Sequence, residues 1–119
     1  KERNAFRRPI ASFQALQVRL VDSAILIESA RALLDRAATA AAQGRRADTL
    51  SAMAKVAASE AAVSATDIGM RVMAGAGFST EFPMERLFRD ARLYTFAPLT
   101  NEMLRNYLAE NHLGLPRSF

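Results

Sequence analysis

The chain has 119 residues, of which 50% are hydrophobic and 24% charged; this allows one domain with a core and excludes two independent domains, a disordered tail and a collagen-like fibre. It has no cysteine, which excludes a disulfide framework, a thiolate zinc site and a cysteine nucleophile, and we expect a cytoplasmic location. The net charge is +4, but basic residues are interleaved with acidic ones and no apolar run approaches the roughly 18–20 residues of a membrane span, so neither nucleic acid nor a membrane is an expected partner.

The start of the chain, Lys1-Glu-Arg-Asn, has no initiator methionine and no signal segment. We therefore interpret the chain as a piece of a longer protein. Residues 1–9 are expected to be the tail of a preceding helix and an entry loop, and residues 10–119 to be a single domain.

Two long helices are predicted first. Residues 10–43 contain neither proline nor glycine, and their apolar side chains recur at steps of three and four, which predicts an amphipathic helix of about 45–50 Å. Gly44 is a stop signal. Asp48 is a suitable N-cap for a second helix that ends near Ala74 and is rich in Ala and Ser, side chains that allow close helix packing.

Two shorter helices follow. Residues 75–82 contain two glycines and are expected to form a loop. Pro83 suits the first position of a helix that ends near Leu93. After an extended stretch, Thr100 is a plausible N-cap for a last helix that ends by Gly114. The pattern predicts an all-α fold, a four-helix bundle.

The residue types leave little independent chemistry. His112 is the only histidine, so a multi-histidine metal site is excluded and no metal is expected. The serines stand in no recognisable pattern with this histidine, which argues against a Ser-His-Asp hydrolase. The segment from Gly75 to Gly77 follows a predicted helix rather than a strand and lacks a following Lys-Ser/Thr pair. It therefore fails both standard phosphate-loop fingerprints.

Several separated stretches nevertheless resemble one family. Arg3 to Ile10 resembles the R-x-x-F-G-x-P-I entry of the acyl-CoA dehydrogenase C-terminal domain, and Pro83 to Arg92 resembles its P-x-E-R-x-x-R-D-A-R. Three further stretches agree in order: Phe13-Gln14 with F-Q, Met53 to Lys55 with A-K, and Arg71 to Phe78 with Q-x-x-G-G-x-G-[YF]. Thr100 to Glu102 resembles the closing T-x-E, so the resemblance covers essentially the whole chain.

The resemblance implies a C-terminal four-helix bundle that binds FAD and assembles with its own subunits, as a homodimer or a homotetramer, within a flavoprotein that acts on an acyl-CoA substrate. The bundle would help to hold the FAD of a neighbouring subunit. Carried over by motif, the cofactor-binding residues are Arg3 at the pyrophosphate, Gln14 through its amide, Arg71 and Gly75 at the adenosine half, and Thr100 and Glu102 at the flavin.

The sequence departs from the family pattern in four places. Arg7 and Ala74 stand where the family has glycine. Arg71 stands where it has glutamine, so Arg71 either binds phosphate in its place or points away. Many members carry the catalytic glutamate in E-G-T, where this chain has Pro98-Leu99-Thr100. Pro98 cannot accept a proton, so the chain contains no residue for this catalytic role.

We therefore expect the FAD-binding and oligomerisation domain of an acyl-CoA dehydrogenase-like oxidoreductase, which by itself is inactive. Either the base lies on an earlier helix outside the chain or the protein performs different flavin chemistry. Two alternatives stay open: a flavin-dependent monooxygenase or oxidase of the same fold, and a non-catalytic helical interaction module.

Overall fold

The computed structural model of the chain describes residues 3–118, which begin with a short hairpin. Strand β1 (Asn4–Ala5) pairs antiparallel with β2 (Arg8–Pro9). Phe6 and Arg7 form its tip with φ of 52° and 63°, the left-handed conformation that a tight two-residue hairpin turn requires. The predicted tail of a preceding helix falls partly on residues 1 and 2, which lie outside the described residues.

The first long helix is divided rather than continuous. A 3-10 turn, η1 (Ile10–Ser12), precedes α1 (Gln14–Ala42), and Phe13 between them is extended. The expectation of one helix from residue 10 was wrong because the Phe13 N–H bonds the Ile10 carbonyl and closes a separate turn. At the other end Gly44 has φ +67°, and the Arg45 N–H bonds the Ala40 carbonyl. This is the Schellman ending that a glycine stop signal predicts.

The second long helix, α2, covers Asp48–Met73. The sequence predicted Asp48 as the N-cap, but the N-cap is Ala47. The Asp48 carboxylate does not cap the helix because it accepts a hydrogen bond from Arg46 Nε at 2.5 Å. The predicted loop after α2 contains one helical turn, α3 (Gly75–Phe78). Ala74 joins α2 to α3 with φ 52° and ψ −130°.

The two shorter helices lie close to their predicted positions. Helix α4 covers Met84–Leu93 and begins one residue after the predicted start, because Pro83 is its N-cap and not its first residue. Helix α5 covers Asn101–Asn111. The expected N-cap at Thr100 is confirmed, because its Oγ1 accepts a hydrogen bond from the Met103 N–H at 3.1 Å.

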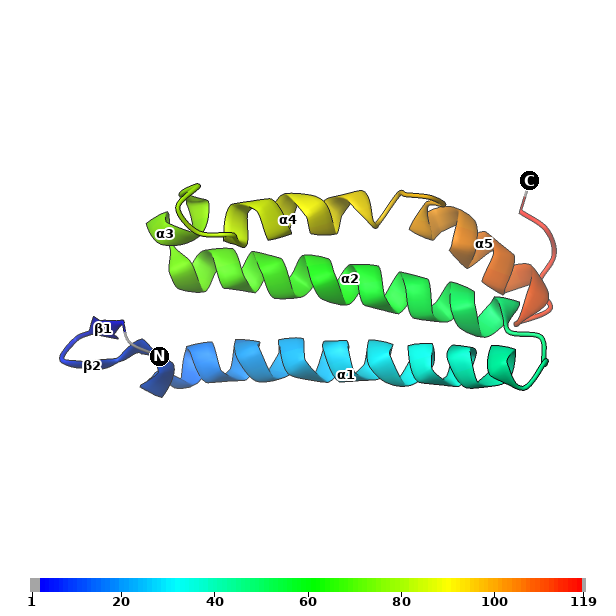
Figure 1. The fold of residues 1–119 in the computed structure, drawn as a ribbon, viewed down its shortest axis with the longest axis horizontal. Coiled ribbons are helices and arrows are strands. Elements are labelled where there is room, and N and C mark those ends of the chain that lie inside the picture. Colours follow the sequence, from blue (N-terminus) through cyan, green and yellow to red (C-terminus); the bar gives the residue numbers. More distant parts are fainter. Residues whose placement is uncertain (1–2, 119) are drawn as a thin grey trace.

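The helices form three rods that run side by side, with α2 antiparallel to its neighbours (Figure 1). Helix α2 lies between α1 on one side and the end-to-end pair α4 and α5 on the other. The described residues measure 56 × 26 × 26 Å with a radius of gyration of 17.8 Å, whereas a compact domain of this length has about 13.5 Å. The all-α bundle expected from the sequence is confirmed, and it is strongly elongated.

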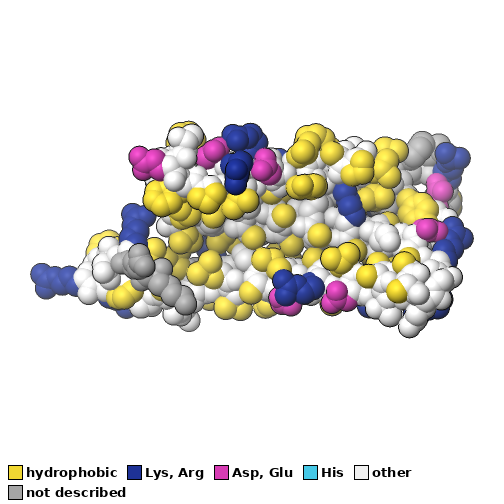
Figure 2. Space-filling view, viewed as in Figure 1, with side chains coloured by type: hydrophobic (Ala, Val, Ile, Leu, Met, Phe, Trp, Pro, Cys, Tyr) yellow, Lys and Arg dark blue, Asp and Glu magenta, His cyan; other side chains and the backbone are white. Residues whose placement is uncertain are grey.

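The core consists of small side chains. On α1, Ser23, Ala30 and Ala37 recur at intervals of seven residues and are buried against α2. No large side chain among the described residues is fully buried. Figure 2 shows hydrophobic side chains spread over the visible face of all three rods. The chain therefore buries a seam of alanine and serine and leaves its large apolar side chains for other surfaces.

Candidate functional site

The first candidate site is a groove between the hairpin and the end of α2. Arg3 and Gly75, which are 72 positions apart in the sequence, both line this groove of about 800 Å³. Its remaining lining residues are Ile10, Val72, Met73, Ala76 and Phe82. Arg3 Nη1 donates to the Met73 carbonyl at 3.5 Å. The fold therefore brings together two of the residues that the sequence selected from different motifs.

The glycines of the turn have different tasks. A Cβ at Gly77 would meet the Met70 carbonyl and the Met73 Cβ at 3.0 Å, whereas one at Gly75 would have no neighbour within 4 Å. Gly77 thus lets α3 pack onto the end of α2, and Gly75 leaves bare backbone open to the groove. Ala74 has a backbone conformation that favours glycine, the residue that the family pattern has there.

Two other predicted residues do not line this groove. Gln14 is the first residue of α1 and is exposed. Arg71 is exposed and its Nε donates to Asp67 Oδ2 at 2.8 Å, an i,i+4 ion pair along α2. The structure thus joins Arg71 to a carboxylate, while its role at a cofactor stays a prediction.

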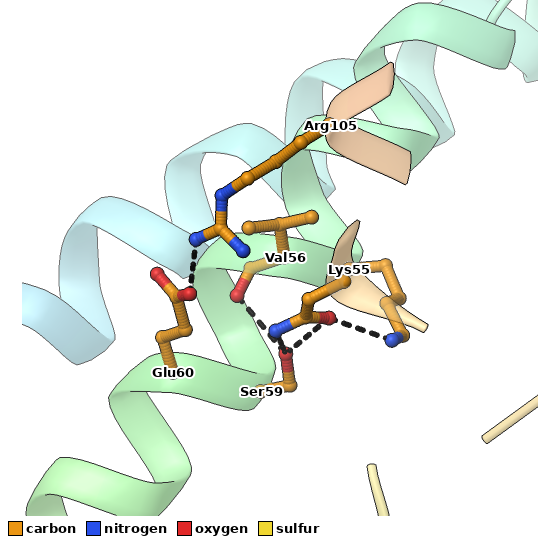
Figure 3. A network of polar contacts seen from close by, with 6 residues as sticks. Lys55, Val56, Ser59, Glu60 and Arg105 are labelled. Atoms are coloured by element: carbon orange, nitrogen blue, oxygen red, sulfur yellow. Dashed lines mark hydrogen bonds and ion pairs between the residues drawn. The ribbon is translucent and has the colours of Figure 1, made fainter. Parts of the chain in front are cut away.

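The second candidate site lies at the N-terminus of α5. Glu102, in the first turn, lines a polar groove of about 360 Å³. The other lining residues are Glu60, Val63, Ser64, Arg92, Thr95 and Asn101. Thr100 caps the same helix end, and Arg105 forms an ion pair with Glu60 across from α2 (Figure 3). Thr100 and Glu102 therefore belong to one helix terminus that faces a polar surface.

Pro98 lies between two apolar hollows. One of about 570 Å³ also has Leu99, Met103 and Leu104 in its wall, and one of about 260 Å³ also has Tyr94 and Ala97. The only carboxylate that lines either hollow among the described residues is Asp48. Asp48 accepts from Arg46, and this hydrogen bond raises the pKa of the guanidinium. The carboxylate in the hollow beside Pro98 is therefore already paired with a guanidinium.

The two sites are separated along α2. Ser59 of α2 bonds the Asn101 side chain at one site, and Met73 of α2 accepts from Arg3 at the other. These positions are 14 residues apart in α2, which corresponds to about 21 Å along the helix axis. Sequence reasoning missed the polar residues that connect α2 to the second site, Lys55 and Asn101, because their pairing spans 46 residues.

Two classes of site are not found in the described part of the chain. Between residues 3 and 118 no three histidine, aspartate or glutamate side chains lie together in a way that could hold a metal ion. In the same range no helix is long and apolar enough to cross a membrane.

Comparison with known proteins gives consistent relationships. The family model described as "Acyl-CoA dehydrogenase, C-terminal domain" matches residues 1–113. The chain is 40% identical over 118 residues to the mitochondrial short-chain specific acyl-CoA dehydrogenase of Mus musculus, covering 99% of this chain and 29% of that protein. It is 39% identical over 116 residues to the 3-sulfinopropanoyl-CoA desulfinase of Paraburkholderia xenovorans, covering 96% of this chain and 29% of that protein.

A solved structure gives the same result for the fold. The FAD complex of PigA superposes with a TM-score of 0.92 at 29% sequence identity, covering 97% of this chain and 30% of the PigA chain. The chain thus spans less than a third of the length of the relatives that it matches.

Proposed function

This chain belongs to the acyl-CoA dehydrogenase family as its C-terminal domain, and we propose on that basis that it holds part of an FAD and joins subunits within a longer flavoprotein. That flavoprotein is proposed to oxidise an acyl-CoA thioester between Cα and Cβ. The observation that carries the proposal is that Arg3 and Gly75, selected by separate motifs, line one groove.

The groove suits a dinucleotide phosphate. Arg3 is exposed, and its one hydrogen bond given above, at 3.5 Å, is at the limit of the usual range. The guanidinium therefore has further N–H donors for a pyrophosphate, which its planar fork can bind in two places. Gly75 permits close approach of the dinucleotide to the backbone. Both features support an FAD held partly by this chain, in our proposal the FAD of a neighbouring subunit.

Gln14 and Arg71 lie next to the groove and not in its wall. Gln14 lies shortly after η1, and Ile10 of η1 lines the groove. The Gln14 amide is therefore near the groove, and we propose that it donates a hydrogen bond to the dinucleotide there. Arg71 lies one residue before Val72, which lines the groove. To bind a phosphate, Arg71 has to exchange its contact with Asp67 for the ligand.

The N-terminus of α5 is the proposed flavin contact. The Thr100 hydroxyl accepts from the Met103 N–H and keeps its own proton to donate to a flavin acceptor. Glu102 lies in the first turn and is exposed on the rim of the polar groove. FAD, when bound, supplies the hydride acceptor. The chain supplies the groups that fix its position.

The exposed faces of α1 support assembly with further copies. Val18, Val21 and Ile25 are spaced by three and four residues along one face, and each is more than half exposed. Burial of such a side chain stabilises by about 1.5–3 kcal/mol. A single chain forgoes this free energy, and a second copy that covers the face recovers it. A homotetramer, or at least a homodimer, is therefore part of the proposal.

The reaction itself depends on residues outside the chain. Pro98 stands at the family base position and cannot accept a proton, and the Asp48 carboxylate in the hollow beside it is paired with Arg46. The base that removes the α-proton is therefore proposed to lie outside this chain. One relative is named a desulfinase and another a dehydrogenase, so membership of the family does not fix one reaction. Base-independent flavin chemistry, as in a monooxygenase or oxidase, is the second candidate. A cytoplasmic location is also proposed, because a chain without cysteine requires no oxidising compartment.

The test uses the full-length protein. Arg3→Ala is expected to weaken FAD binding by about 10–100-fold, because a charge-assisted hydrogen bond to a phosphate is lost. Arg31→Ala is the matched control, since Arg31 is an exposed arginine that pairs with Glu28 on α1. Equal FAD affinity in both variants contradicts the proposed site.

The same preparation separates the candidate functions. Bleaching of the bound flavin by an acyl-CoA under anaerobic conditions supports the dehydrogenase. Oxygen consumption by the reduced flavin without acyl-CoA turnover supports the monooxygenase or oxidase. A protein that binds no FAD supports the interaction module.

A further inference from the structure

A polar network with a buried centre connects α2 to the N-terminal end of α5 (Figure 3). Lys55 Nζ of α2 donates to the Leu99 carbonyl and to Asn101 Oδ1, each at 2.7 Å. Asn101 Nδ2 donates to Ser59 Oγ at 3.0 Å. Asn101 is 3% exposed and Ser59 is 4% exposed. The network therefore crosses from one rod to the next inside the packed interface.

The chemistry of the donors fixes how this network is arranged. An ammonium group has only donors, so the Asn101 oxygen has to face Lys55 and its amide nitrogen has to face Ser59. Ser59 Oγ then accepts from Asn101 Nδ2, and its single proton has two acceptors in reach, the Val56 carbonyl at 3.0 Å and Asn101 Oδ1 at 3.1 Å. Because every member has a partner, loss of one side chain leaves a buried polar group unsatisfied, which is costly.

The two contacts of Lys55 lie on either side of Thr100. Leu99 is the residue before it and Asn101 is the residue after it, so one ammonium group contacts the backbone carbonyl on one side of Thr100 and a side-chain oxygen on the other. Both acceptors are neutral oxygens, and no ion pair of Lys55 occurs among residues 3–118. Lys55 also lines both apolar hollows beside Pro98. Its position indicates a task at this turn rather than in a salt bridge.

We propose that Lys55 is a positioning residue for the flavin: by holding the Leu99 carbonyl and the Asn101 side chain, it fixes the orientation in which Thr100 meets the isoalloxazine ring. This inference rests on the proposed FAD-binding function. Lys55 lies on α2, distant in sequence from Thr100, and is proposed to act on the flavin only through the turn around Thr100. The pair of Arg105 with Glu60 connects the same two helices but is about half exposed and does not touch the turn.

The experiment compares two variants of the full-length flavoprotein. Lys55→Met removes the ammonium and keeps an apolar stem of similar reach. Arg105→Met removes a polar contact between α2 and α5 that does not involve the turn, the ion pair with Glu60, and serves as the matched control. Amide hydrogen exchange reports the turn directly, because the Asn101 N–H bonds the Thr95 carbonyl and the Met103 N–H bonds Thr100 Oγ1. The visible circular dichroism of the bound flavin reports its orientation.

Lys55→Met is expected to speed exchange at Asn101 and Met103 by about tenfold or more and to change the flavin dichroism. Arg105→Met is expected to leave both signals as in the wild type. Lys55→Arg keeps the charge and two donors, and its flavin signal is expected to lie closer to the wild type than that of Lys55→Met. If Lys55→Met does not fold, Lys55→Gln provides the same comparison with a shorter donor.

Unchanged exchange and unchanged dichroism in Lys55→Met overturn the inference, and so does an equal response in Arg105→Met. Faster exchange with an unchanged flavin signal also overturns it, because the turn is then held without consequence for the flavin. A wild-type protein without FAD refutes the proposed function instead. In that case the exchange data alone still decide whether Lys55 holds the turn.

Discussion

Replacement of Ala74 by glycine is expected to stabilise the domain. Ala74 has φ 52° and ψ −130° at the junction of α2 and α3, a region that costs a residue with a Cβ about 1–3 kcal/mol. Glycine removes this strain but adds roughly 0.5–1 kcal/mol of backbone entropy to the unfolded state. Ala74 is exposed, so removal of its methyl group sacrifices little burial. The net expectation is a gain of about 1 kcal/mol.

The measurement is unfolding by heat or guanidinium chloride, followed by far-ultraviolet circular dichroism. A gain of about 1 kcal/mol raises Tm by roughly 2–8 °C, depending on the size of the cooperative unit. Ala76→Gly is the matched control, since Ala76 is also an exposed alanine in this turn but is not among the residues with positive φ. It is expected to lose roughly 0.5–1 kcal/mol, the usual cost of glycine in a helix.

A decrease in stability of Ala74→Gly equal to that of Ala76→Gly would refute the reasoning. Such a result means that the backbone at Ala74 is not strained. The glycine that the family pattern has at this position would then need a reason other than conformation, such as room for the dinucleotide. FAD affinity measured on the same variants tests that reason separately.

Three further predictions address other parts of the fold. Gly44→Ala, at φ +67° with open space around the added Cβ, should lose about 1 kcal/mol in the same unfolding assay, and an unchanged midpoint would show that the helix ends without a left-handed residue. Thr100→Ala should lower the free energy of unfolding by about 0.5–2 kcal/mol through loss of the N-cap, whereas Thr100→Ser should retain the cap. Equal unfolding midpoints of the two variants would contradict a stabilising cap at Thr100. Ile25→Arg should lower the mass of the assembly in sedimentation experiments, because Ile25 is 58% exposed on the face assigned to a second copy, and an unaltered mass removes that face from the interface.

Much of the fold follows from local sequence signals. The helix end at Gly44, the N-cap at Thr100 and the short helix after Pro83 were predicted from single residues whose backbone preferences are strong. The predicted start of α1 and the predicted N-cap of α2 were wrong because another local contact formed in place of the predicted one. The carboxylate of Asp48 pairs with Arg46 instead of capping α2, and a separate turn forms before Phe13.

The candidate site was predictable only in part. The motifs selected Arg3, Gly75, Thr100 and Glu102 one by one, because each resembles a family position. The motifs did not indicate how close these residues lie to one another in the folded chain. Residue spacing along a helix indicates which face a side chain occupies, but it does not indicate which element packs against that face. The grouping of Arg3 with Gly75, and of Thr100 with Glu102, came from the structure.

The sequence by itself therefore determined the helical class, the ends of most helices, the absence of a base at Pro98 and the family resemblance, all of which depend on residue type and local spacing. Only the tertiary structure decided that Lys55 holds both sides of Thr100, that Ala74 and Arg7 have left-handed φ, and that α2 separates two candidate sites. The contacts of Lys55 and the separation of the sites depend on how three rods pack through a seam of alanine and serine. Such packing joins residues more than 40 positions apart, and no local pattern records it.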